Sequence, residues 1–317
     1  MKTVGRASPT QHSVPHLEAR PESARVVLIA NLGSRRTEEM YEHAQRLLAE
    51  QAVPIAESYA VRTGSDLRKL VAQAVRSHAG IVIVGGGDGT LTSVVGEFAH
   101  RETILGVLPF GTGNSFARSL GLKPTIAAAV DTIAGGRVAR VDLGLVNGTH
   151  FANFTAIGLS SKISQHTPAA LKKAFGPLAY VLAGIGPTLR SQAFEAVLEW
   201  PGGSEKLTSH QLIVASGRYY GLVPIVPDAS IVDGKLDVFT ATGFNRWEIA
   251  RMFVALFFGM HTRLTEAEYF SGPEVTVTIA PPQELDVDGE VRGMTPARFS
   301  VDPKALRVLV PEGFTGY

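Results

Sequence analysis

The 317-residue chain contains no cysteine, and its formal net charge at pH 7 is only +1. Without cysteine, the protein cannot form disulfides, bind a metal through thiolates or use a cysteine nucleophile. This composition fits a reducing compartment, and we expect a cytoplasmic protein. The near-zero charge also argues against nucleic-acid binding, because proteins that bind nucleic acid usually present a strongly basic face.

Long hydrophobic runs are missing as well. The most apolar stretch, Met252–Met260, is far shorter than the roughly 20 residues that a helix needs to cross a bilayer. The first 24 residues carry prolines and scattered charges but lack the apolar core of a signal peptide. We therefore expect no membrane span, and we interpret residues 1–24 as a disordered leader.

From residue 25 onward, short apolar runs alternate with segments of helical periodicity. The predicted order is strand 25–30, a helix capped by Thr37, strand 53–60, a helix capped by Asp66, strand 81–84, helix 91–99 and strand 104–108. Alternation of this kind predicts a parallel, doubly wound sheet with helices on both faces.

From about Val141, short strand signals dominate, and turn residues such as Asn147-Gly148 separate them. The predicted strands are 141–146, 151–157, 194–200, 211–215, 236–240, 275–279 and 307–310. Two helical segments, 168–189 and 246–260, interrupt this series. The pattern predicts a mainly antiparallel β domain.

These two sequence patterns predict two domains. We expect an α/β domain over residues 25–140 and a β-rich domain over residues 141–305. The last segment, residues 306–317, is expected to return to the first domain.

A cluster of glycines, GGGDGT at Gly85–Thr90, follows the third predicted strand. Glycine lacks a Cβ, so the backbone can approach a ligand closely, and the first turn of a helix offers free N–H groups to phosphate. Asp88 is unexpected beside phosphate; we expect it to cap the following helix or to help hold a divalent cation. The common nucleotide fingerprints do not fit, because their lysine or third glycine is absent. A plain strand-to-helix connection therefore stays an alternative for this first glycine loop alone.

A second glycine loop, PFGTGNSFA at Pro109–Ala117, follows the next predicted strand and also opens a helix. Loops at the carboxyl ends of neighbouring parallel strands face the same crevice, where ligands bind. The two loops together predict a site for nucleotide phosphates. Neither loop contains lysine or arginine. Arg35, Arg36 and Arg118 are candidates to neutralise phosphate charge, although a solvated surface position is the simpler interpretation of each.

A third motif is acidic, with four carboxylates in the seven residues Glu284–Glu290. If residues 284–288 form a strand, Glu284, Asp286 and Asp288 share one face, because side chains alternate along a strand. Crowded carboxylates repel one another, which raises a pKa toward values useful to a general base. A solvated hairpin with an Asp-Gly turn is the alternative.

Together these motifs resemble the diacylglycerol kinase catalytic family, in particular the bacterial lipid kinases of the YegS type. The resemblance rests on GGGDGT, PFGTGNSFA, VDG at Val232–Gly234 and DGE at Asp288–Glu290, in that order, and extends from about Arg25 to Pro311. It implies a two-domain enzyme in which ATP lies in the cleft and a hydroxyl-bearing lipid is phosphorylated with magnesium.

The resemblance also implies roles for single residues. Those that would bind ATP are Asn31, Gly86, Gly87, Asp88, Gly89 and Thr90, with Gly111, Thr112, Gly113 and Asn114 from the second glycine loop. Asp233, with the carbonyls of Ser230 and Lys235, would match a magnesium site. Asp288 would be the catalytic base and Glu290 its acidic neighbour.

The chain departs from the family pattern at a few positions. Thr92, Ser93, Ser115 and Val232 stand where the family usually has an amide or acidic residue. These departures leave the fold and the nucleotide site as expected, but they bear on the metal arrangement and on turnover.

The sequence therefore predicts an ATP- and magnesium-dependent lipid kinase that acts on a hydroxyl of diacylglycerol, a related glycerolipid or a sphingoid base. Two alternatives stay open: a kinase of a soluble substrate with an NAD-kinase-like fold, and a nucleotide-binding regulatory protein with weakened catalysis. A homodimer and transient contact with the inner membrane surface also stay open.

Overall fold

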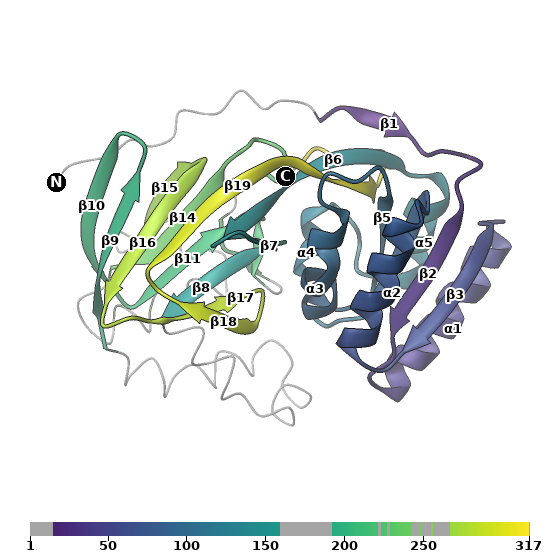
Figure 1. The fold of residues 1–317 in the computed structure, drawn as a ribbon, viewed down its shortest axis with the longest axis horizontal. Coiled ribbons are helices and arrows are strands. Elements are labelled where there is room, and N and C mark those ends of the chain that lie inside the picture. The colour runs from purple at the N-terminus through teal and green to yellow at the C-terminus, as the bar shows by residue number, and fades with distance from the viewer. Residues whose placement is uncertain are drawn as a thin grey trace.

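The computed structural model describes residues 15–158, 192–220, 223–226, 229–242 and 267–316, together with residues 248, 251 and 255. Figure 1 shows an α/β half and a β-rich half side by side, joined by long strands. None of the helices in the described part of the chain combines the length and the apolar character that a membrane span requires.

The α/β half is built on four parallel strands in the order β5, β4, β2, β3. Their bounds are β2 (Val26–Asn31), β3 (Ile55–Val61), β4 (Ile81–Gly86) and β5 (Ile104–Pro109). The helices are α1 (Arg35–Glu50), α2 (Gly64–Arg76), α3 (Asp88–Phe98), α4 (Ser115–Ser119) and α5 (Ile126–Gly135). One apolar core joins α2, α3 and α4 to the sheet, and another joins α1 and α5 to its opposite face. The predicted doubly wound parallel sheet is confirmed, although α5 was not foreseen from the sequence.

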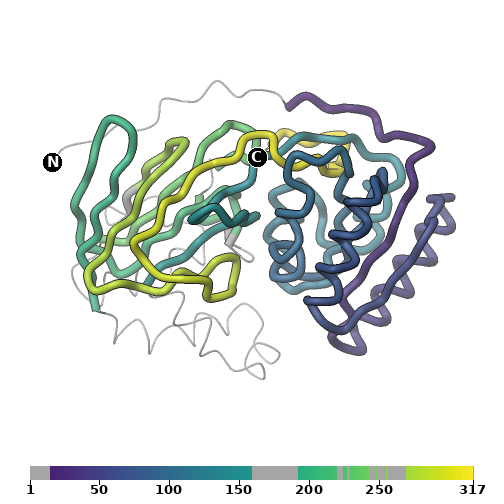
Figure 2. Tube along the Cα trace, viewed as in Figure 1, coloured from purple at the N-terminus to yellow at the C-terminus, as the bar shows by residue number. Residues whose placement is uncertain are grey.

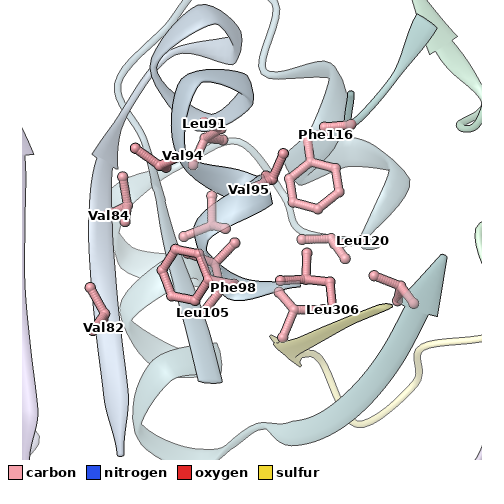
Figure 3. Close-up of a cluster of buried hydrophobic side chains, with 14 of the residues drawn as sticks. Val82, Val84, Leu91, Val94, Val95, Phe98, Leu105, Phe116, Leu120 and Leu306 are labelled. Carbon is pink, nitrogen blue, oxygen red and sulfur yellow. The ribbon is translucent and has the colours of Figure 1, made fainter. Parts of the chain in front are cut away.

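The surroundings of strand β4 explain why its sequence is apolar throughout. Val82 and Val84 belong to the core beneath α2 and α3, whereas Ile81 and Ile83 belong to the core beneath α1 and α5. Figure 3 shows Val82 and Val84 facing the cluster that includes Phe98 of α3. A parallel strand covered by helices on both faces has no solvated side, so every position is apolar.

Two helices begin three residues earlier than the sequence predicted. Ser34 caps α1 and Thr63 caps α2, and each side-chain oxygen accepts from the backbone N–H three residues on. Thr37 and Asp66, the predicted caps, are the partners at that third position. In each pair both residues are common cap formers, so residue type alone does not tell which of the two caps the helix.

Within the described residues, the β-rich half contains an antiparallel sheet of six strands. In spatial order its strands are β15 (Ala267–Gly272), β14 (Leu236–Ala241), β11 (Gln211–Ala215), β8 (Phe154–Gly158), β17 (Glu284–Val287) and β18 (Glu290–Met294). The parallel strands of the α/β half continue past β5 into a second run of strands in the β-rich half, in the order β19 (Ala297–Val310), β16 (Glu274–Ala280), β9 (Phe194–Trp200) and β10 (Gly203–Ser209). A shared apolar core packs the antiparallel sheet against these four strands. The predicted antiparallel β domain is confirmed. The helices predicted at 168–189 and 246–260 lie outside the described residues, apart from positions 248, 251 and 255.

Strand β19 belongs to both halves. Its first part pairs with β16, with Ser300 opposite Glu274, and its last part runs parallel to β5, with Val308 opposite Leu105. It also pairs along most of its length with β6 (Arg137–Val146), which continues into β7 (Thr149–Phe151). Figure 2 shows this yellow strand running from one half into the other. The domain boundary expected at residue 306 therefore falls inside a strand.

The leader is more ordered than the sequence predicted. Residues 17–19 form β1 (Leu17–Ala19), which pairs with β6. The carboxylate of Glu18 forms ion pairs with Arg307 at 2.6 Å and with Arg140 at 3.4 Å. Burial raises the pKa of Glu18, but the two arginines outweigh it and hold that pKa below its usual value. The disordered-leader prediction is wrong for these residues, because their partners lie far away in the sequence; residues 1–14 are outside the described part.

Candidate active site

The two glycine loops touch each other at the carboxyl ends of β4 and β5. The backbone N–H of Phe110 donates to the Gly86 carbonyl at 3.0 Å. A Cβ built on Gly111 would lie 2.8 Å from the Cα of Gly87, and one on Gly86 would lie 2.4 Å from the Thr90 side chain. Glycine is required at position 111 because a side chain there would separate the two loops, and at position 86 because a side chain there would collide with Thr90 within the first loop. The two loops therefore form one continuous surface.

Gly111→Ala is expected to lower the free energy of unfolding by about 1–3 kcal/mol, since the new methyl group meets backbone that cannot rotate away. Gly135→Ala is a matched control at the end of α5, where a Cβ would meet no atom of the described residues within 4 Å. Urea denaturation of both variants and the wild type measures the difference. Equal midpoints for Gly111→Ala and the wild type would contradict the close approach of the loops.

Asp88 links the two loops. It is the first residue of α3, yet its carboxylate accepts hydrogen bonds from the Phe116 backbone N–H at 3.2 Å and from the Ser115 hydroxyl at 3.3 Å. The sequence predicted that Asp88 could cap α3, but its carboxylate instead accepts from the first turn of α4. Ser115, a departure from the family pattern, is one of its partners.

The N-terminus of α3 is left open to a ligand. Its cap residue is Gly87, and no side chain among the described residues caps it. The free N–H groups of its first turn, with their partial positive charge, favour an anion such as phosphate.

Asn114 shapes the second loop from within. It has a left-handed backbone with φ 50°, and its buried side chain accepts from the Gly111 N–H and donates to the Gly111 carbonyl, both at 2.9 Å. Thr112 is exposed at the tip of the loop, next to Gly113.

A cleft of about 600 Å³ opens beside the first glycine loop. The residues lining it are Asn31, Gly64, Ser65, Arg68, Lys69, Gly89, Thr90, Ser93, Glu290 and Arg292. They come from the end of β2, from α2, from α3 and from the β17–β18 hairpin, so both halves contribute. This volume suits a small-molecule ligand. The Asn31 Oδ1 atom is buried and has no hydrogen-bond partner among the described residues, so it can accept from a ligand.

The cations of the cleft are not the ones suggested by the sequence. Arg68 and Lys69 of α2 and Arg292 of β18 line it. Arg35 and Arg36 do not, and neither does Arg118, whose Nε donates to the Gly113 carbonyl at 2.9 Å and so supports the second loop. The start of α2 could have been foreseen, because it follows a parallel strand at the same edge of the sheet as the glycine loops.

Asp288 is buried at the junction between the two halves. Its carboxylate accepts four hydrogen bonds: from the Thr92 hydroxyl at 2.7 Å, and from the backbone N–H groups of Ala152, Asn153 and Phe154 at 2.8, 3.0 and 2.8 Å. Thr92 stands where the family usually has an amide or acidic residue, and here it ties α3 to the hairpin. A carboxylate has about four acceptor positions, so this group is saturated.

The conformation of the Asp288–Gly289 turn sends this side chain inward. Strand β17 ends at Val287, and Asp288 and Gly289 have φ of 49° and 94°, as in a two-residue Asp-Gly hairpin turn. The Asp-Gly alternative is therefore the one observed, although Asp288 is not solvated. Glu284 is exposed and a bulge separates it from Asp286, so the predicted acidic face is not formed.

Burial raises the pKa of Asp288 to about 6, against the effect of its hydrogen bonds, and the charge of Asp88 adds to the rise. Burial therefore disfavours the charged form of this carboxyl, whereas its four hydrogen-bond donors favour that form.

Glu290, in contrast, faces the cleft. It begins β18, directly after the turn, and its Oε1 lies 3.7 Å from the position of a Cβ built on Gly89. Its Oε2 accepts from Arg292 at 2.6 Å. Figure 1 shows the β17–β18 hairpin on the side of the β-rich half that faces α3. Of the two acidic residues in DGE, Glu290 is the one with a side chain in the cleft.

The predicted metal residues Ser230, Asp233 and Lys235 lie away from this cleft, against β6. The Asp142 carboxylate accepts from the Gly234 N–H at 2.7 Å, and Asp233 accepts from the Lys235 N–H at 3.1 Å. Burial raises the pKa of Asp233, and the charge of Asp142 raises it further. Hard divalent cations prefer oxygen ligands, which these neighbouring carboxylates supply. Within the described ranges, however, no three acidic or histidine side chains converge on a point, so backbone carbonyls would have to complete the site.

The structure thus brings together part of the predicted site. Asn31, Gly89, Thr90 and Glu290 line the cleft. The remaining predicted nucleotide residues shape the two loops behind it, and Asp288 anchors the hairpin. The resemblance implied none of the α2 residues and did not include Arg292.

Two family models match this chain. The model described as the diacylglycerol kinase catalytic domain matches residues 25–146. The model described as the YegS C-terminal NAD kinase beta sandwich-like domain matches residues 153–310. The matches correspond to the α/β half and to the β-rich half with β19.

Curated proteins of similar sequence include the diacylglycerol kinase of Bacillus subtilis (strain 168). The two chains are 31% identical over 273 residues, which are 83% of this chain and 88% of that protein. The diacylglycerol kinase of Staphylococcus saprophyticus is 29% identical over 259 residues, 80% of this chain and 84% of that protein.

Solved structures resemble the whole fold. The crystal structure of a diacylglycerol kinase from Bacillus anthracis str. Sterne superposes with a TM-score of 0.73 over 90% of this chain and 97% of that chain. At 23% sequence identity, this likeness supports the two-part architecture and nothing finer.

Proposed function

Because the chain belongs to the diacylglycerol kinase family, we propose that it transfers the γ-phosphate of ATP to a hydroxyl of diacylglycerol or of a related glycerolipid or sphingoid lipid. The observation that carries this proposal is the cleft that has Gly89 and Thr90 on one wall and Glu290 on another. Transfer of a phosphoryl group to an alcohol requires a turn that binds the phosphates and a base that accepts the proton of the hydroxyl. The cleft offers a candidate for each.

In this proposal, the first glycine loop and the open start of α3 bind the phosphates of ATP. Arg68 and Lys69 supply positive charge from α2, and Asn31 accepts a hydrogen bond from the nucleotide through its unpartnered Oδ1. Phosphoryl transfer depends chiefly on such positioning and charge neutralisation.

We assign the role of general base to Glu290 instead of Asp288. All four acceptor positions of Asp288 are occupied by protein donors, so it has none left for the proton of a hydroxyl. The Glu290 Oε1 accepts no hydrogen bond from a described residue and faces the glycine loop. Asp288 would instead hold the hairpin that carries this base.

Magnesium would accompany the nucleotide and neutralise part of its phosphate charge. A second, structural magnesium ion would be held by Asp233 with the carbonyls of Ser230 and Lys235, near Asp142. The oxygen donors at that position suit the ion, and they would keep the loop at 230–235 against β6.

Labelled phosphate transfer from ATP with magnesium, tested on diacylglycerol, sphingosine and NAD in parallel, distinguishes the proposal from its alternatives. Labelled phosphatidic acid or another phospholipid is the expected product. Label in NADP alone would favour the soluble-substrate kinase. ATP binding without transfer to any acceptor would favour the regulatory protein.

A further inference from the structure

Arg292 pairs with Glu290 on the same face of β18. Side chains two residues apart on a strand point in the same direction, and both of these line the cleft. The guanidinium donates to Glu290 Oε2 through Nε at 3.1 Å and through Nη2 at 2.6 Å. The arginine side chain is the less exposed of the two, at 27% against 54%.

This pairing engages only one oxygen of the carboxylate. Both donors reach Oε2, which leaves Oε1 on the side of Gly89, 3.7 Å from the position of a Cβ there. The planar fork of an arginine sets the orientation of a carboxylate as well as balancing its charge, which a lysine would do less well.

Arg292 also balances the charge of Glu290 in the cleft. A bare carboxylate beside a nucleotide triphosphate would repel it, and the repulsion is strong at short range in a partly buried cleft. Arg292 neutralises Glu290 at the wall of the cleft, so the phosphates can approach the first glycine loop without that penalty.

We propose that Arg292 is a positioning residue for phosphoryl transfer: it orients Glu290 Oε1 toward the glycine loop and cancels the repulsion between Glu290 and the nucleotide. The inference rests on the proposed nucleotide site and on Glu290 as its base. Arg292 lies outside the four sequence motifs, so the inference adds a residue to the proposed site.

The direct test is a double-mutant cycle of ATP affinity, which needs no acceptor lipid. Calorimetry with ATP and magnesium compares the wild type, Arg292→Ala, Glu290→Gln and the double variant. Loss of Arg292 alone is expected to weaken ATP binding about tenfold, because it leaves an unbalanced carboxylate beside the phosphates. The double variant is expected to bind within about twofold of the wild type, because the repelling charge is gone as well.

A second readout separates orientation from charge. Arg292→Lys keeps the charge but loses the fork, so ATP affinity should stay within about twofold while kcat for transfer falls about tenfold or more. Arg298→Ala is the matched control: Arg298 forms a similar pair with Glu274, at 2.6 Å, outside the cleft. Both affinity and kcat should be unchanged in that variant.

Wild-type ATP affinity in Arg292→Ala would overturn the inference. So would a double variant as weak as Arg292→Ala, because Arg292 would then act on the nucleotide and not through Glu290. A wild-type protein that bound no ATP would instead overturn the nucleotide site itself, and the inference with it.

Discussion

Glu290→Gln is expected to lower kcat for phosphate transfer to diacylglycerol by a factor of about 10²–10⁴, the usual effect of removing a general base. The amide keeps the size of the side chain and can still accept from Arg292, but it cannot take the proton of the attacking hydroxyl. Since Glu290 is half exposed at the start of β18, the free energy of unfolding should change little. Steady-state kinetics in lipid micelles measure kcat, and urea denaturation measures the free energy of unfolding.

Glu274→Gln is the control for this prediction. Glu274 also pairs with an arginine on a strand, yet it lies outside the cleft. It should transfer phosphate at the wild-type rate. A Glu290→Gln enzyme with full kcat would show that another group accepts the proton and would withdraw the assignment of the base.

The second large effect is expected on folding. Asp288→Ala should lower the free energy of unfolding by about 3–5 kcal/mol, because three backbone N–H groups and a hydroxyl lose their acceptor in a buried position. Alanine in the left-handed conformation of this turn adds about 1 kcal/mol to the cost. This loss is a large part of the total stability of an ordinary domain.

Two further variants make the result specific. Asp288→Asn keeps one acceptor oxygen and tolerates the left-handed backbone, so its loss should be intermediate. Asp131→Ala removes an exposed carboxylate of α5 that accepts a single hydrogen bond, from Gln51 at 2.6 Å, and should stay within about 1 kcal/mol of the wild type. An Asp288→Ala protein as stable as the wild type would exclude the anchoring role.

The Glu290 and Asp288 variants also distinguish the roles of two carboxylates that lie close together in the sequence. Glu290→Gln should give a folded protein that binds ATP and transfers little phosphate. Asp288→Ala should give an unstable protein whose activity falls together with its stability. The reverse pattern would return the base to Asp288, the role that the family resemblance implied.

Much of the architecture could be predicted from the sequence because it is written in local patterns. The apolar runs of β4 and β5 and the helical spacing after them require a parallel sheet covered on both faces. The glycines at the carboxyl ends of these strands predict, from residue type alone, that the two loops form one site. The acidic hairpin was likewise visible, as an Asp-Gly dipeptide within a strand signal.

What the tertiary structure alone decided is which of these residues face the ligand. The left-handed turn at Asp288 sends one carboxylate to the backbone at 152–154 and leaves Glu290 in the cleft, a choice that depends on contacts across more than a hundred residues of chain. The same holds for Arg68 and Arg292, which share no motif and line the same cleft only because the fold brings α2 and β18 to it. Periodicity and composition report how a residue relates to its neighbours in the chain, whereas charge balance in a site depends on residues that only folding brings together.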